Sequence, residues 1–165
     1  MAIERIKNHF EEEAKEFDAI IQRLIPNYNE MIAALVSVIP FSKERAFSMI
    51  DLGCGTGTVS KAVKGCFPNA EITCVDIAGS MLEIARDKLG GSVNCIQADF
   101  NDFDFQRTFD LIVSSLALHH LETDDAASRA RACSRIYAQT RLILAGSQFQ
   151  AMRALSMSSC MMMAV

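Results

Sequence analysis

The stretch MIDLGCGTGTVS, Met49 to Ser60, decides the fold. An apolar run reaches the acid Asp51, and glycines then occupy the alternate positions Gly53, Gly55 and Gly57. Glycine has no Cβ, so it accepts positive φ angles and lets a ligand lie against the backbone. A tight turn alone needs only one or two glycines. Three of them predict a ligand-binding turn between a buried strand and a helix.

Apolar and amphipathic segments alternate after this turn. Continuous apolar runs indicate buried strands, and apolar residues at helical spacing indicate helices. We expect strands at 47–52, 71–76, 93–98 and 109–118, and helices at 58–66 and 80–89. Ser80 and Glu83 occupy capping-box positions of the second helix. The alternation predicts an α/β fold: a Rossmann-like, doubly wound, mostly parallel sheet with helices on both faces.

The segment before the first strand is helical in pattern. Apolar residues recur at helical spacing in residues 2–17, 18–25 and 31–39. We therefore expect a helical lid or cap at residues 1–45, a ligand-binding core at 46–146 and an atypical tail at 147–165.

Acids stand at the ends of three successive predicted strands: Asp51, Asp76 and Asp99. Ligands of open parallel sheets bind beyond the carboxyl ends of the strands, so these acids should face one crevice. Asp76 can accept hydrogen bonds from both ribose hydroxyls, each worth about 1.5–3 kcal/mol. Asp99 can accept one from an adenine amino group, with Phe100 or Ile77 against the ring. Asp51 favours a cationic ligand part over the pyrophosphate that G-x-G-x-x-G turns bind.

These residues resemble the class I S-adenosylmethionine-dependent methyltransferases. The resemblance covers roughly residues 47–121, through DLGCGTG, VDIAGSML, ADFNDF and FDLIVSSLALHHL. It implies a Rossmann-like core that binds S-adenosylmethionine. The segment FDAIIQRLIPNYNEMI is similar to the region before the core in bacterial enzymes of the tRNA wobble-uridine carboxymethyl pathway and in related small-molecule methyltransferases. It implies a small-molecule or tRNA acceptor, with Phe17 and Tyr28 reaching the donor from above.

The resemblance also implies the donor-binding residues. The methionine moiety would lie against Asp51, Gly53 and Gly55, and its end near Ser114 and Ser115. The ribose and adenine would lie against the ends of the second and third strands. The full expected set is Asp51, Gly53, Cys54, Gly55, Gly57, Asp76, Ile77, Met81, Asp99, Phe100 and Ser114.

Methyl transfer depends on alignment, because the donor is already activated, so no universal catalytic residue is expected. A base is needed only when the acceptor must lose a proton. His119 and His120, just past the fourth strand, are the candidates, and the alternative is that both are structural loop histidines. Two other functions stay open. One is a binding-only remnant that holds the donor without turnover, and the other is an NAD-dependent oxidoreductase.

The composition changes sharply along the chain. Residues 1–125 hold all 20 acids and 11 of the 16 basic residues, whereas residues 126–165 hold five arginines and no acid. Arg141–Ala145 has the pattern of a fifth strand, but no closing hairpin is visible after it. The tail is interpreted as a frameshifted or truncated product, a natural short variant or an RNA-binding arm, and the compositional break favours the first. An aberrant tail would leave the sheet without its last strands and promote oligomerisation.

Other classes of protein are disfavoured. No apolar run approaches the roughly 20 residues that span a bilayer, and the charged N-terminus lacks the features of a secretory signal, so we expect a cytoplasmic protein without a membrane partner. The six cysteines form no C-x-x-C pair. They are interpreted as small buried hydrophobic residues, and no metal site is expected.

Overall fold

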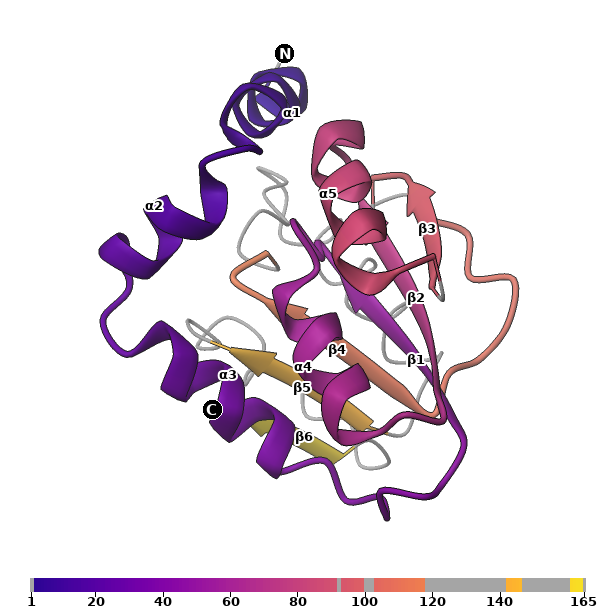
Figure 1. Ribbon diagram of the computed structural model, residues 1–165. Coiled ribbons are helices and arrows are strands. Elements are labelled where there is room, and N and C mark those ends of the chain that lie inside the picture. The colour runs from indigo at the N-terminus through magenta and orange to yellow at the C-terminus, as the bar shows by residue number, and fades with distance from the viewer. Residues whose placement is uncertain (1, 92, 100–102, 118–141, 147–160, 165) are drawn as a thin grey trace.

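Six strands of the computed structural model form one parallel sheet in the order β3-β2-β1-β4-β5-β6 (Figure 1). The structure describes residues 2–91, 93–99, 103–117, 142–146 and 161–164. The strands are β1 Phe47–Leu52, β2 Ala70–Asp76, β3 Asn94–Gln97, β4 Leu111–Ser115, β5 Leu142–Gly146 and β6 Met161–Ala164. The strand order reverses at β1, between β2 and β4. This confirms the doubly wound parallel sheet and places a ligand crevice at the carboxyl end of β1.

Five helices belong to the described part of the chain. They are α1 Ala2–Glu13, α2 Phe17–Leu24, α3 Tyr28–Ser37, α4 Thr58–Cys66 and α5 Gly79–Leu89. Helices α3, α4 and α5 share one apolar core with alternate residues of the central strands, among them Met49, Ile72 and Val113. Ile50 and Ile112 alternate with those residues and are also fully buried. The helices expected on the second face lie outside the described residues.

Several boundaries of helices and strands agree with those predicted from local sequence patterns. Strand β1 and helix α4 have the predicted bounds, 47–52 and 58–66. The two helices predicted at 2–17 and 18–25 correspond to α1 and α2, but the first ends at Glu13, just before Ala14, which is buried against Ala78 and Met81.

The capping box predicted for α5 is wrong. Ala78 is the N-cap residue of α5, and no local side chain caps the helix. Glu11 of α1 takes that place, because its carboxylate accepts hydrogen bonds from the amides of Gly79 and Ser80 at 2.7 and 2.9 Å. A residue 68 positions away therefore provides the cap.

Strand β6 lies in the methionine-rich end of the chain, where the sequence pattern did not indicate a strand. It pairs in parallel with β5, from Leu142↔Met161 to Ala145↔Ala164. Strand β5 itself lies where the fifth strand was expected. The sheet thus extends one strand beyond residue 146, and that strand is not part of an antiparallel hairpin.

Candidate functional site

The glycine turn after β1 has the backbone that its sequence predicts. Gly53, Gly55 and Gly57 have φ angles of 68°, 53° and 76°, in the left-handed region that side chains disfavour. The amides of Gly53 and Cys54 donate to the carbonyl of Val75 at 2.8 and 3.1 Å. The turn is therefore fastened to the end of β2.

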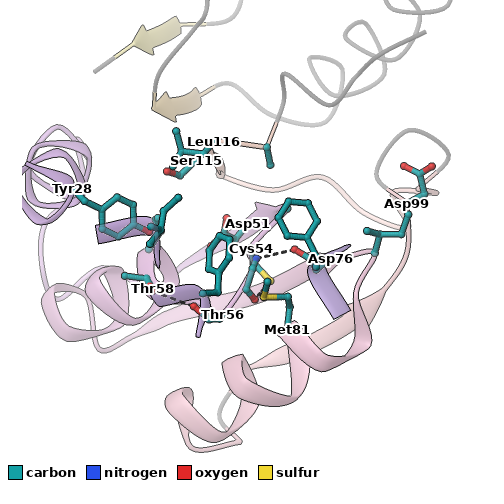
Figure 2. Close-up of a pocket in the computed structure, with 18 residues that line it drawn as sticks. Tyr28, Asp51, Cys54, Thr56, Thr58, Asp76, Met81, Asp99, Ser115 and Leu116 are labelled. Carbon is teal, nitrogen blue, oxygen red and sulfur yellow. Dashed lines mark hydrogen bonds between the residues drawn. The ribbon is translucent and has the colours of Figure 1, made fainter. Parts of the chain in front are cut away.

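A pocket lies at the carboxyl ends of the central strands, between this turn and the N-terminal helices (Figure 2). Its empty space is about 900 Å³, part of which is open to solvent. Eight of the expected donor-binding residues line it: Asp51, Gly53, Cys54, Gly55, Asp76, Ile77, Met81 and Asp99. Residues from the ends of three strands, β1, β2 and β3, thus converge on one cavity, as their positions in the sequence predicted.

Asp76 connects the end of β2 to the glycine turn. Its Oδ2 accepts a hydrogen bond from the Gly55 amide at 2.8 Å, and its Oδ1 accepts one from the Ala78 amide at 3.0 Å. Burial raises the pKa of the carboxyl group, and the amide donors oppose that rise. A carboxylate offers about four acceptor sites, so Asp76 retains capacity for at least one further donor from a ligand.

Asp51 is almost completely buried, with only 1% of its surface exposed. Burial raises its pKa to about 7, the hydrogen bond from the Ser60 hydroxyl opposes the rise, and the charge of Asp76 adds to it. Ser60 Oγ donates to Asp51 Oδ2 at 2.7 Å. Near neutral pH this carboxyl group can therefore change its protonation state in response to a nearby cation.

The two serines at the end of β4 have different surroundings. Successive side chains of a strand point to opposite faces, so only one of the pair can face the pocket. Ser115 lines the pocket, and its Oγ is buried and has no hydrogen-bond partner among the described residues. Ser114 was expected there, but its Oγ instead donates to the carbonyl of Leu52 at 2.8 Å. The next residue, Leu116, lines the pocket with a φ angle of 58°, which is strained for a branched side chain.

Gly57 was also expected against the ligand, but it is not among the residues that line the pocket. A Cβ at this position would lie 3.0 Å from Ala85 Cβ and 3.2 Å from Leu89 Cδ1. Gly57 therefore allows the start of α4 to pack against α5. The first two glycines of the turn face the pocket, and the third serves helix packing.

The N-terminal helices supply the wall opposite the glycine turn. Phe17 and Tyr28, which the resemblance places above the donor, line the pocket, and Figure 2 shows Tyr28 at one end of it, far from Asp99. A Cβ on Gly55 would lie 3.7 Å from the Phe17 ring. The remaining lining residues were not predicted from the sequence: Phe10, Ile21, Thr56, Thr58, Val59, Leu116 and Ala117. Only Thr56 and Thr58 had a usable signal, because they flank the third glycine of the turn.

Several expectations fall outside the described residues, namely those for Phe100, His119 and His120. Within the described part of the chain, no group of three His, Cys, Asp or Glu side chains could hold a metal ion. None of the helices described there is long and apolar enough to cross a bilayer.

The sequence pattern of a methyltransferase-domain family matches residues 49–140, which is more than half of the chain. The chain belongs to this methyltransferase family. The match begins in β1 and includes the glycine turn and the ends of β2 and β4. It confirms the resemblance to the class I S-adenosylmethionine-dependent methyltransferases that the motifs indicated.

Two curated relatives of this chain are malonyl-(acyl-carrier protein) O-methyltransferases. That of Acetivibrio thermocellus is 30% identical over 113 residues, which cover 67% of this chain and 38% of the relative. Enzyme 1 of Ilyobacter polytropus is 28% identical over 120 residues, which cover 72% of this chain and 43% of the relative. The chain thus spans about two fifths of the length of these relatives.

A solved structure described as a DhpI-SAM-HEP complex has the same fold. It superposes with a TM-score of 0.67 at 19% identity, over 84% of this chain and 60% of that one. At this identity the likeness shows the fold of the chain.

Proposed function

We propose that this methyltransferase binds S-adenosylmethionine in the pocket at the strand ends and transfers the methyl group to a small-molecule or RNA acceptor. Family membership supports the reaction class. The observation that carries the assignment of the donor is the position of Asp76, which holds the glycine turn through Gly55 and lines the same pocket.

The nucleoside of the donor fits the end of the pocket formed by β2 and β3. Asp76 would accept hydrogen bonds from the ribose hydroxyls, since its carboxylate retains acceptor capacity. Ile77 and Met81 supply apolar surface for the adenine, and Asp99 lies where the ring edge would be. Figure 2 shows Asp99 and Met81 on different sides of this end of the pocket.

The methionine part of the donor fits the other end. Gly53 and Gly55 present backbone without side chains, so a ligand can lie close to it. A cation placed above Asp51 would favour the ionised carboxylate and lower its pKa. The unpartnered hydroxyl of Ser115 offers one more polar contact at the end of β4.

The chain itself contributes alignment and the exclusion of water. When bound, S-adenosylmethionine supplies a methyl group on a positively charged sulfur, ready for displacement by a nucleophile. Phe17, Ile21 and Leu116 form apolar walls around the space where donor and acceptor would meet. Well-oriented reactants gain on the order of 10⁵–10⁸ M in effective concentration, so positioning alone supplies a large share of the rate.

The acceptor is less closely defined than the donor. The named relatives act on malonyl-(acyl-carrier protein), and this chain covers about two fifths of their length. Residues 1–45 would serve as a cap whose side chains, including Phe10 and Tyr28, help to define the acceptor space. His119 and His120 are the candidate bases for an acceptor that must lose a proton.

Calorimetric titration and methyl-transfer assays test this proposal together. We expect S-adenosylmethionine and S-adenosylhomocysteine to bind, and NAD to bind far more weakly, because Asp51 beside the turn disfavours a pyrophosphate. Transfer of labelled methyl groups should then be measured on carboxylate, amine, thiol and RNA acceptors. Binding of NAD in place of the donor would contradict the assignment. Donor binding without transfer to any acceptor would favour a binding-only protein.

A further inference from the structure

Glu11 attaches the first helix to the core at the edge of the pocket. Its two carboxylate oxygens accept hydrogen bonds from the amides of Gly79 and Ser80 at 2.7 and 2.9 Å, and its carbonyl accepts one from Ser80 Oγ at 3.3 Å. The Ser80 hydroxyl, together with these two amides, holds the pKa of Glu11 below its usual range. Unpaired amides and the positive end of the helix dipole both favour a carboxylate at this place. Figure 1 shows α1 beside α5, where this contact forms.

Asp18 attaches the second helix to the core at a separate point. Its Oδ2 accepts a hydrogen bond from Lys88 Nζ at 2.7 Å, and its Oδ1 accepts one from the Thr56 hydroxyl. Lys88 is only 17% exposed and also donates to the hydroxyls of Thr56 and Thr58 at 3.0 and 3.3 Å. Partly desolvated charge pairs with several donors are stronger than exposed pairs.

The segment between these two attachments forms part of the pocket wall. Phe10 and Phe17 both line the pocket, and their ring centroids are 6.0 Å apart. The Phe17 ring lies over Gly55 in the glycine turn. A ligand held against this turn would therefore lie beneath Phe17. Passage of the ligand on the side covered by Phe17 would require this segment to move.

The apolar contacts of helix α2 come from half-buried side chains, among them Phe17 and Ile21. None of its residues is buried, and Leu24 is the one large hydrophobic side chain among the described residues with most of its surface exposed. Segments with few buried apolar contacts open locally at low free-energy cost. The contacts of Glu11 and Asp18 are therefore the main polar restraints on residues 2–24.

We propose that Glu11 and Asp18 are positioning residues that hold residues 2–24 closed over the donor pocket, and that release of these two contacts gates ligand exchange. The proposal rests on the proposed function, because it takes the pocket to be the donor site. It assigns the two carboxylates no contact with the donor. Their loss should speed both the entry and the exit of the ligand.

The test compares Glu11→Gln and Asp18→Asn with Glu12→Gln, which changes an exposed acid of the same helix. Association of tritiated S-adenosylmethionine is followed by rapid filtration. Its release is followed in the same way after excess unlabelled ligand is added. We expect both rates to rise about tenfold in each of the first two variants, because each loses a charge-assisted contact, and to stay unchanged in Glu12→Gln. A merely structural role would weaken binding without faster association.

Hydrogen exchange of the ligand-free protein supplies a second measurement. The amides of Gly79 and Ser80 should exchange about tenfold faster in Glu11→Gln than in the Glu12→Gln control, since the capping carboxylate is lost. Unchanged association and release rates in both variants would overturn the gate while leaving the donor site intact. If the wild-type protein bound no donor, the proposed function would fail and the gate with it, whatever the exchange rates of these amides.

Discussion

Replacement of Asp51 by asparagine should stabilise the protein, and more strongly as the pH rises. Burial raises the pKa of Asp51 to about 7 in the folded protein, against 3.8 for an ordinary aspartate. Between these values the folded state holds one proton more than the unfolded state. The contribution of Asp51 to the free energy of unfolding is therefore greatest below about pH 4 and decreases as the pH rises towards about 7.

The size of the effect follows from this shift. One pKa unit corresponds to about 1.4 kcal/mol, so a rise from 3.8 to about 7 amounts to roughly 4 kcal/mol above neutral pH. Asparagine has the same shape and cannot ionise, and its side-chain oxygen can still accept the hydrogen bond from Ser60. Glu11 and Asp18 have lowered pKa values and act in the opposite direction. Both residues are present in wild type and in Asp51→Asn, so their contribution cancels when the stabilities of the two proteins are subtracted at each pH.

Urea unfolding followed by circular dichroism measures this difference between about pH 5 and pH 8.5, over most of the window in which Asp51 titrates. The stability gain of Asp51→Asn should grow by about 1.4 kcal/mol per pH unit up to about pH 7 and then level off. Asp87→Asn removes an exposed carboxylate of α5 and controls for the loss of one negative charge. A gain that stays constant or shrinks with rising pH would refute the reasoning.

Three further changes test the other parts of the site. Asp76→Asn should weaken the binding of S-adenosylhomocysteine about 10- to 100-fold in calorimetry, because a charged hydrogen bond contributes about 1.5–3 kcal/mol; equal affinity would remove this residue from the ribose site. Gly57→Ala should lower the free energy of unfolding by at least about 1–2 kcal/mol, because of the positive φ angle and the close approach to Ala85. The control Gly65→Ala, whose added Cβ has no atom within 4 Å, should raise the free energy of unfolding by up to about 1 kcal/mol. Ser115→Ala should stabilise the ligand-free protein by about 1 kcal/mol in thermal unfolding, since it removes a buried hydroxyl without a partner; a loss of stability would show that the hydroxyl is satisfied.

Much of the core could be predicted because its signals are local. The bounds of β1 and α4 follow from an apolar run, a glycine turn and an amphipathic segment that are contiguous in the sequence. The convergence of Asp51, Asp76 and Asp99 follows from one rule, since parallel strands end at the same edge of a sheet.

The errors concern residues whose partners are distant in the sequence. Ser80 has the local signature of a helix cap, yet Glu11 fills that role from α1. Gly57 looks like a ligand glycine in its motif, but its lack of a side chain serves packing against Ala85. Ser114 and Ser115 are neighbours in the sequence, and the pleat of β4 separates their environments.

The sequence by itself determined the alternation of strands and helices, the left-handed glycine turn and the acids at the strand ends, because backbone sterics and hydrophobic periodicity act over a few residues. The tertiary structure alone decided the protonation behaviour of Asp51, the unpartnered hydroxyl of Ser115 and the two carboxylates that fasten the N-terminal helices. These properties depend on burial and on contacts between segments up to 70 positions apart. No local pattern encodes which of those segments meet.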